Sequence, residues 1–212
     1  MAKRKTPEEK AARVRAMKDF DISKKHGKLL AGVDEAGRGA IAGPVFAAAV
    51  VLPDDVIIDG INDSKQLSKK KRALLFDIIK EKAIAYCVCS VDQNEIEKIN
   101  ILQATFKAMR GAVNGLDVTP DYVLIDGNMS PGVDIAHEAV IKGDSKSMTV
   151  AAASILAKVS RDRFMVKMAD TYPGYGFENH KGYGTPSHKA AAIELGACEL
   201  HRKSFFKNWL KK

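Results

Sequence analysis

The sequence has few of the features that mark exported or membrane proteins. Its 212 residues include only three cysteines, at no spacing typical of a metal site. An odd number of cysteines favours a reducing compartment, where buried free thiols are expected. No apolar run approaches the ~18 residues of a membrane span, and the basic N-terminus lacks the apolar core and cleavage site of a signal peptide. We therefore expect a cytoplasmic protein without a membrane segment.

Acidic residues are scarce at both ends of the chain, so the net charge of +8 is unevenly distributed. Residues 1–28 carry ten Lys or Arg against four Asp or Glu, and residues 201–212 carry five against none. The body between them is mildly acidic. Basic ends fit a polyanionic partner such as a nucleic acid, and they fit a role in solubility equally well.

The apolar segments predict an α/β fold. Strands are expected near 29–34, 44–52, 83–91, 121–126 and 132–144. Helices are expected over 68–82, capped by Ser68, then from about 92 to Gly115, and over 145–170 and 187–196. The glycine- and aromatic-rich segment 172–188 is expected to be a loop. A polar, partly helical extension, 1–27, would precede one domain, 28–212, built on a mixed β-sheet covered by helices.

Carboxylates stand where the predicted strands end. Asp34 and Glu35 end the first strand, Asp126 the fourth and Asp144 the fifth. In open α/β sheets, ligands gather beyond the carboxyl ends of strands, so these acids are expected to converge on one patch. Unpaired, they would raise one another's pKa values, and a hard divalent cation such as Mg²⁺ or Mn²⁺ would relieve that conflict. Two such ions can promote hydrolysis of a phosphodiester.

A glycine-rich loop with one arginine follows the first pair of acids. Without side chains at Gly37, Gly39 and Gly43, the backbone could approach a sugar–phosphate chain closely. Its N–H groups could bind phosphate or a sugar hydroxyl, beside the positive charge of Arg38. The loop lacks the final GK[ST] of a nucleotide P-loop. The alternative is a tight turn that the acids cap.

These residues, together with several later segments, closely resemble the ribonuclease HII family, the type 2 ribonucleases H. DEAGRG with GPV downstream is similar to the family's opening signature, and NDSKQLS at 62–68 resembles its next segment. LIDG, KGD, AAASILAKVSRD, KGYGTPSH and HRKSF follow in the family's order, so the resemblance covers about residues 29–205. It implies a ribonuclease H-like catalytic domain with helical additions at its C-terminus.

The resemblance also implies an activity. It implies endonucleolytic cleavage of the RNA strand of RNA/DNA hybrids and incision 5′ to single ribonucleotides embedded in duplex DNA, with Mn²⁺ or Mg²⁺ as cofactor. Activated water would attack the phosphorus, and 3′-OH and 5′-phosphate ends would remain. Such an enzyme would serve ribonucleotide excision repair, and a monomer is the expected state.

By motif, the resemblance assigns roles to nine residues. The catalytic, metal-binding residues would be Asp34, Glu35, Asp126 and Asp144. The substrate-binding residues would be Gly37, Arg38 and Gly39, at the ribonucleotide 2′-OH and nearby phosphates, with Lys65 on a backbone phosphate and Tyr183 stacked on the sugar at the RNA–DNA junction. The 2′-OH is the group that distinguishes RNA from DNA, which agrees with a loop built for close approach.

Several assignments keep an alternative. Asp162 is expected to be a structural ion-pair partner, and its place in the fourth metal site instead of Asp144 is the second assignment. His188 is more often structural at such a position than catalytic. Tyr183 could be a core residue, although its glycine neighbours favour an exposed loop. The N-terminal extension could strengthen duplex binding or act as a solubility tail.

Other functions remain as alternatives to the ribonuclease. They are an inactive nucleic-acid-binding module, another nuclease on the same fold such as a junction resolvase or a proofreading exonuclease, and an enzyme acting on small phosphorylated molecules. A duplex with a single ribonucleotide, tested with and without Mn²⁺, would separate them.

Overall fold

A five-stranded mixed sheet organises the chain in the computed structural model, which describes residues 6–25 and 28–210. Its strands are β1 (Leu30–Ala36), β2 (Val45–Val51), β3 (Ala85–Val91), β4 (Tyr122–Asp126) and β5 (His137–Val140). They lie in the order β3-β2-β1-β4-β5. The pairs β1–β2 and β2–β3 are antiparallel, and β1–β4 and β4–β5 are parallel. The α/β class expected from the sequence is confirmed.

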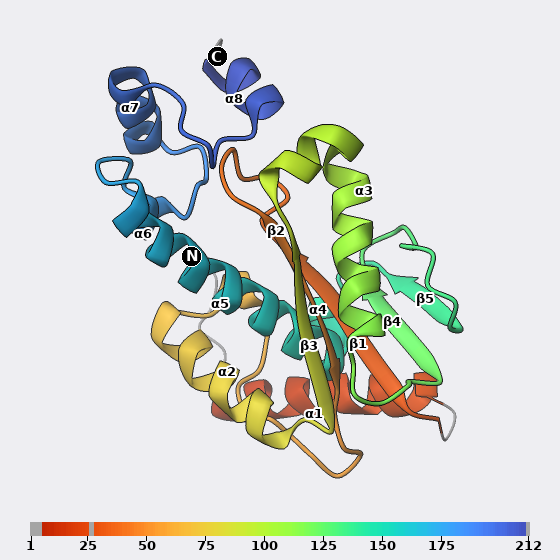
Figure 1. Ribbon diagram of the computed structural model, residues 1–212. Helices are drawn as coiled ribbons and strands as arrows, with labels where there is room; N and C mark the ends of the chain where they lie inside the picture. The colour runs from red at the N-terminus through yellow and green to blue at the C-terminus, as the bar shows by residue number, and fades with distance from the viewer. Residues whose placement is uncertain (1–5, 26–27, 211–212) are drawn as a thin grey trace.

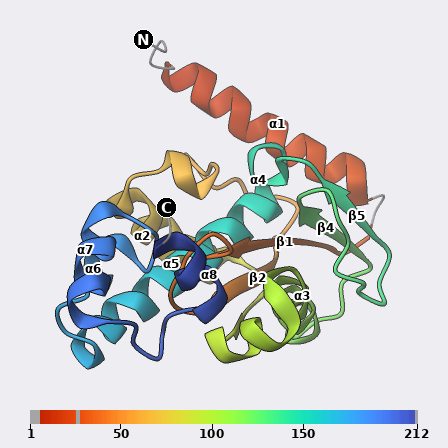
Figure 2. The same ribbon diagram turned by 90° about the horizontal axis from the view of Figure 1, so that it is seen from above.

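Helices cover both faces of this sheet (Figures 1 and 2). On one face packs α3 (Gln93–Asn114), and on the other α5 (Met148–Thr171), with α1 (Pro7–Lys25) and α2 (Lys69–Lys82) beside it. The shorter helices are η1 (Ser64–Gln66), α4 (Gly143–Lys146), α6 (Phe177–His180), α7 (Pro186–Leu195) and α8 (Lys203–Leu210). None of the described helices has the length and apolarity needed to cross a bilayer.

Strand β1 is buried on both faces, and its alternation decides where its acids point. Ala31 and Val33 join the cluster around α3. Gly32 points the other way, and an added Cβ there would lie 2.3 Å from the backbone of Thr149 at the start of α5. Because side chains alternate along a strand, Asp34 shares the α5 face with Gly32 and Glu35 shares the α3 face with Val33.

The helix α1 packs on the domain. Val14 and Met17 are buried in the core cluster that includes α2 and α5. The carboxylate of buried Asp21 accepts a hydrogen bond of 3.0 Å from the backbone N–H of Thr149. Burial raises the pKa of Asp21 to about 6. Residues 1–5 and 26–27 of the predicted extension lie outside the described residues.

The structure differs from the sequence-based expectation mainly between the fourth strand and the long helix. The predicted strand 132–144 forms only over His137–Val140, because Lys142 adopts a left-handed conformation with φ 57° and turns the chain. The predicted helix 145–170 is divided at Ser147, which caps α5 through the N–H of Val150. The predicted loop 172–188 contains α6. Ser68 caps α2 as expected, through the N–H of Lys71.

Candidate active site

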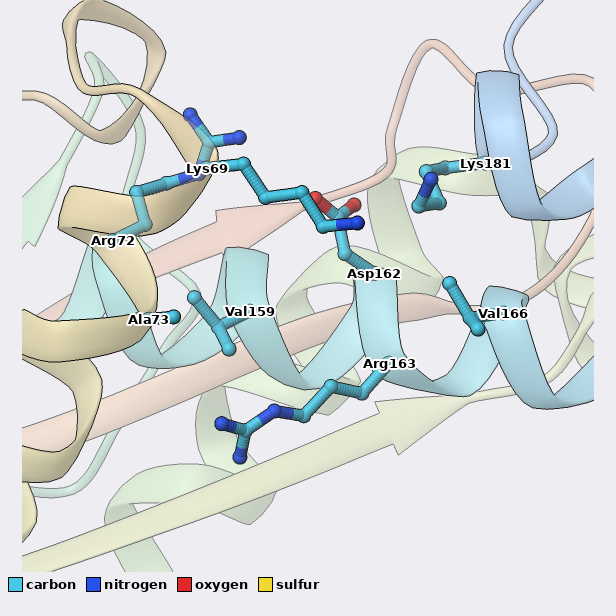
Figure 3. Close-up of a pocket in the computed structure, with 8 residues that line it drawn as sticks. All are labelled: Lys69, Arg72, Ala73, Val159, Asp162, Arg163, Val166 and Lys181. Atoms are coloured by element: carbon cyan, nitrogen blue, oxygen red, sulfur yellow. The ribbon is translucent and has the colours of Figure 1, made fainter.

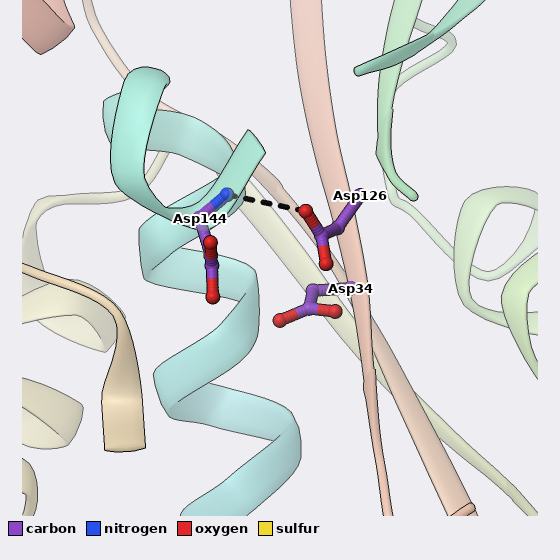
Figure 4. A group of neighbouring side chains, drawn as sticks. All are labelled: Asp34, Asp126 and Asp144. Atoms are coloured by element: carbon purple, nitrogen blue, oxygen red, sulfur yellow. Dashed lines mark hydrogen bonds between the residues drawn. The ribbon is translucent and has the colours of Figure 1, made fainter. Parts of the chain in front are cut away.

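Three carboxylates meet at one end of the sheet. Asp34 lies two residues before the end of β1, Asp126 ends β4, and Asp144 lies on α4. One oxygen of each lies within 4.8 Å of the others. Because β1 and β4 are parallel with Val33 beside Ile125, Asp34 and Asp126 follow at adjacent positions. Figure 4 shows the three side chains pointing toward one another, as the sequence predicted for these acids.

Asp144 reaches this group from a helix, which corrects the expectation that it ends a strand. The Oδ1 atom of Asp126 accepts hydrogen bonds from the backbone N–H of Gly143 at 2.7 Å and of Asp144 at 3.4 Å. A carboxylate in this position caps the first turn of a helix, so Asp126 itself fixes the start of α4. The Asp144 side chain, which is buried, is thereby presented to the other two acids.

Glu35 stands apart from the three-carboxylate group. It points to the α3 face, where it lines a small cavity with Arg38, Asp126 and residues of α3. Its Oε1 atom lies 3.7 Å from Nη1 of Arg38. The structure therefore places Glu35 on the opposite side of Asp126 from Asp144, within reach of the same edge of the sheet.

The protein holds these acids under electrostatic strain. Burial raises the pKa of Asp34 well above its ordinary value, and the charges of Glu35 and Asp126 raise it further. Burial raises the pKa of Asp144 to about 6, with Asp126 as the next cause. Burial also raises the pKa of Glu35, while Arg38 opposes that rise. Each group would lose its charge more readily than a free carboxylic acid.

The donor set fits a hard divalent cation. All the converging atoms are carboxylate oxygens, which Mg²⁺ and Mn²⁺ prefer over nitrogen or sulfur. Lys65 supplies part of the missing positive charge. Burial by itself would lower the pKa of Lys65, but Asp34, Asp63 and Asp144 together raise it. One ammonium beside several acids leaves a net negative site that a cation would stabilise.

The predicted substrate-binding residues line one cleft next to the acids. Its volume is about 410 Å³, and its walls come from the loop after β1, η1, α5 and the loop before α7. The lining residues include Glu35, Gly37, Arg38, Gly39, Lys65 and Tyr183, together with Ser64, Ser154 and Lys158. Segments far apart in the sequence therefore share one surface, as a substrate site requires.

The glycines of the loop differ in what surrounds them. Gly37 has φ +102°, and an added Cβ would lie 2.1 Å from Nε of Arg161. Gly43 has φ +83°, and its Cβ would meet Met165. At Gly39 an added Cβ would have no heavy atom within 4 Å. The expectation that all three glycines leave room for substrate is thus corrected: protein atoms fill that space at two of them, and only Gly39 faces open space.

Lys65 is held by the short helix that carries it. The Asp63 side chain accepts a hydrogen bond from the N–H of Lys65 at 2.8 Å and caps η1. Arg72 donates through Nη1 to the carbonyl of Ser64 at 2.8 Å. Arg72 also lines a second cavity of about 280 Å³ between α2 and α5, drawn in Figure 3. Arg72 therefore links the two cavities: it lines the second cavity, and its hydrogen bond to Ser64 supports η1, which lines the cleft beside the acids.

Tyr183 is half-buried, and two cations of α5 lie near its ring. Nζ of Lys158 and Cζ of Arg161 stand 5.2 Å and 5.1 Å from its ring centroid. This position, in the cleft wall, agrees with the expected exposed loop rather than with the core. Asp162 forms an ion pair with Lys158 at 2.8 Å and lies outside the group of three acids, as the structural assignment predicted.

His188 is fully buried and has a structural environment. Its Nδ1 atom lies 2.9 Å from the carbonyl of Tyr183, and its Nε2 atom lies 3.1 Å from Nε2 of His201. Burial lowers the pKa of His188 to about 4, so the ring is neutral at physiological pH. It supports the turn that carries Tyr183 and does not line the cleft.

Four residues around the site were not singled out from the sequence. Lys158 and Ser154 line the cleft from α5, and Arg161 and Arg202 lie buried beneath the glycine loop. All four belong to the segments AAASILAKVSRD and HRKSF that carry the resemblance. A charged residue inside an otherwise apolar helix pattern was the available signal, because such residues are rarely buried without a specific partner.

Comparisons with known proteins agree with this geometry. A sequence profile described as Ribonuclease HII matches residues 31–208. Ribonuclease HII 1 of Methylibium petroleiphilum is 57% identical over 180 residues, which cover 85% of this chain and 91% of that protein. Ribonuclease HII of Caldicellulosiruptor saccharolyticus is 53% identical over 184 residues, covering 87% and 90%. The crystal structure of ribonuclease H2 from Pyrococcus horikoshii OT3 superimposes with a TM-score of 0.70 at 28% identity, covering 86% of this chain and 97% of that one.

Proposed function

The chain belongs to the ribonuclease HII family, and from this premise we propose that it incises duplex DNA 5′ to single embedded ribonucleotides as well as hydrolysing the RNA strand of RNA/DNA hybrids. Ribonuclease H activity follows from the family itself. The finer specificity is supported above all by one observation: the open backbone at Gly39 and the ring of Tyr183 line the same cleft, next to three convergent acids.

Ribose recognition would come from the loop after β1. The space beside Gly39 allows a sugar to approach the backbone, and Arg38 is half exposed at the cleft wall. Tyr183 would lie against the next sugar, because it lines the same cleft as the loop. Lys65 and Lys158 would hold phosphates without reading sequence. A duplex would thus be recognised by one 2′-OH and by its backbone shape.

The reaction would be hydrolysis of the phosphodiester bond on the 5′ side of the ribonucleotide. Asp34, Asp126 and Asp144, with Glu35 at their edge, would hold Mg²⁺ or Mn²⁺. Such ions, when bound, activate water and stabilise the leaving oxygen. The water oxygen forms a bond to phosphorus, the bond to the 3′ oxygen of the preceding nucleotide breaks, and that oxygen takes up a proton. The products carry 3′-OH and 5′-phosphate ends.

The chain's own residues prepare this step. Asp126 keeps one oxygen engaged with the N–H of Gly143, which leaves its other oxygen toward Asp34. Ser154, on α5, opposes the rise in the pKa of Asp34, and its hydroxyl lies 2.9 Å from that of Ser64. A monomer acting in the cytoplasm in ribonucleotide excision repair completes the proposal.

An end-labelled DNA duplex with one internal ribonucleotide tests this function. The wild-type protein with Mn²⁺ or Mg²⁺ should cut once, 5′ to the ribonucleotide, and the all-DNA duplex should stay intact. Product ends are checked by ligation and by phosphatase sensitivity. No incision of the single-ribonucleotide duplex, with retained cleavage of a long hybrid, would refute the finer specificity and leave the family activity standing.

Three matched Asp→Asn variants test the site in the same assay. Asp34→Asn and Asp144→Asn should each reduce cleavage at least ~1,000-fold, which corresponds to ~4 kcal/mol of transition-state stabilisation. Asp162→Asn is the comparison, because Asp162 lies outside the acidic group and the substitution breaks only its ion pair with Lys158, so it should cost at most about tenfold. Loss of activity in Asp162→Asn with retained activity in Asp144→Asn would reverse the assignment of the fourth acid.

A further inference from the structure

Two arginines lie fully buried beneath the glycine loop, away from the acids. Arg161, on α5, and Arg202, just before α8, are each 0% exposed. Within the described part of the chain neither forms a salt bridge with a carboxylate. A buried cation without a carboxylate partner is costly unless its donors are satisfied, so the partners of these guanidinium groups indicate what they do.

Arg202 binds the loop from below. Its Nη1 atom donates to the carbonyls of Arg38 at 2.9 Å and Ala40 at 2.8 Å. Its Nη2 atom donates to the carbonyl of Gly37 at 2.8 Å, and its Nε atom to that of Gly43 at 2.9 Å. A single planar group therefore binds four carbonyls of one turn. The N–H groups of residues 40–43 donate in turn to the carbonyls of Gly37, Gly182 and Leu200, so the loop is held through both kinds of backbone group.

Arg161 joins the same loop to the turn that carries Tyr183. Its Nε and Nη2 atoms donate to the carbonyls of Pro44 at 3.0 Å and Ala42 at 3.1 Å. Its Nη1 atom donates to the carbonyl of Lys181 at 3.0 Å, and its Cζ atom lies 5.1 Å from the ring centroid of Tyr183. One side chain thus connects the loop to the Tyr183 turn, in addition to the hydrogen bonds from the N–H groups of Ile41 and Ala42 to the carbonyl of Gly182.

The geometry requires arginine rather than a generic cation. A guanidinium group presents five N–H donors in a rigid plane, whereas the lysine ammonium is a flexible point charge with three. Gly37 packs directly on this plane, since a Cβ there would lie 2.1 Å from Nε of Arg161. The two arginines and the glycine loop therefore fit one another.

We propose that Arg161 and Arg202 are positioning residues for ribose selection: they hold the 37–43 loop and the Tyr183 turn in the shape that distinguishes ribose from deoxyribose. The inference rests on the proposed function, because it assigns the ribose-reading shape to residues that touch no substrate. It predicts that loosening this support changes selectivity more than it changes binding of duplex DNA as such.

Three Arg→Lys variants test the proposal. Arg161→Lys and Arg202→Lys keep the charge and remove the planar donor set. Arg163→Lys is the matched control, because Arg163 stacks on Phe76 at 4.3 Å, away from the loop. Dissociation constants are measured for two duplexes that differ in one 2′-OH. The buffer contains Ca²⁺ in place of Mg²⁺, because Ca²⁺ also binds oxygen ligands but with a different geometry.

The expected readout is the ratio of the two dissociation constants. Wild type and Arg163→Lys should prefer the ribose duplex, and the ratio should fall about tenfold or more in Arg161→Lys and Arg202→Lys. A fold defect alone lowers the active fraction and leaves the ratio unchanged, so an unchanged ratio in both variants would overturn the proposal. Equal binding of both duplexes by wild type would instead refute ribose reading, and with it the proposed function.

Wild-type protein supplies a second measurement if the variants do not fold. Amide hydrogen exchange without substrate should be as slow in residues 40–43 as in the buried part of α5, because their N–H groups donate to the carbonyls of Gly37, Gly182 and Leu200 only while the loop keeps this shape. Exchange at the rate of an unprotected loop would show that the loop is not held in this shape, and would overturn the proposal independently of any substitution.

Discussion

The Asp126 carboxylate accepts a hydrogen bond from the backbone N–H of Gly143 at 2.7 Å and thereby caps the helix that carries Asp144. One acid of the candidate site thus positions another. The arrangement explains how three carboxylates lie within 4.8 Å of one another: two backbone N–H groups offset part of the negative charge at Asp126, while burial raises the pKa values of Asp34 and Asp144, so that these two lose their charge more readily. Holding these acids together comes at the expense of stability.

The pH dependence of the free energy of unfolding should reveal this loss of stability. Asp144 has a pKa of about 6 in the folded protein against an ordinary value of 3.8. Because the folded state binds this proton more tightly than the unfolded chain, the stabilisation is complete below about pH 4 and is lost as the pH rises through about 6. In EDTA at pH 7.5, Asp144→Asn should therefore be more stable than wild type by about 1–3 kcal/mol in urea unfolding.

Divalent cations should reverse this difference. Mg²⁺ should raise the free energy of unfolding of wild type at pH 7.5, less at pH 5.5 where protons compete, and least in Asp144→Asn. The difference between wild type and variant in EDTA should vanish near pH 4. A wild-type protein as stable as the variant at pH 7.5 in EDTA would contradict the view that these carboxylates repel one another.

Features of the site that are set by neighbouring residues could be predicted from the sequence, and features set by residues distant in sequence could not. Apolar runs ending in Asp34 and Asp126 are local signals, and they located the end of β4, the last residues of β1 and the convergence of these acids at one edge of the sheet. The position of Asp144 on a helix was missed because its cause is the side chain of Asp126, distant in sequence. The packing of Gly37 on Arg161 was missed for the same reason, since no pattern near the loop announces it.

Gly37 and Gly39 should respond differently to alanine. Gly37 has a positive φ and no room for a Cβ, so Gly37→Ala should lose about 1–3 kcal/mol of unfolding free energy. Gly39 faces open space at an ordinary φ, so Gly39→Ala should stay within about 0.5 kcal/mol of wild type. The same methyl group should nevertheless weaken binding of a ribonucleotide-containing duplex at least about tenfold.

Urea unfolding and duplex binding, measured on both variants, check this pair. A Gly39→Ala protein that binds the duplex like wild type would show that substrate does not approach the loop there. A Gly37→Ala protein of undiminished stability would show that the loop relaxes around Arg161.

Tyr183 should act through its ring rather than its hydroxyl group. The ring forms part of the cleft wall and lies near Lys158 and Arg161 of α5. Tyr183→Phe should therefore keep kcat/KM for the single-ribonucleotide duplex within about threefold. Tyr183→Ala should lose about tenfold or more, because a stacking contact contributes ~1–3 kcal/mol. If the phenylalanine variant is as defective as the alanine variant, the hydroxyl group and not the ring makes the essential contact.

The helix α1 should contribute to folding, whatever else it does. Met17 is 1% exposed and packs into the core cluster that includes α5, while Arg15 on the same helix is exposed. Met17→Ala should lower the free energy of unfolding by about 2–4 kcal/mol, and Arg15→Ala should change it by less than about 0.5 kcal/mol.

Because Met17→Ala removes no charge, the slope of log affinity against log salt for a duplex should stay unchanged, whereas each lost phosphate contact would flatten it by ~0.9. A stable Met17→Ala protein would mean that α1 does not pack on the domain in solution, and a flattened slope in Arg15→Ala would assign the exposed face of this helix to the duplex.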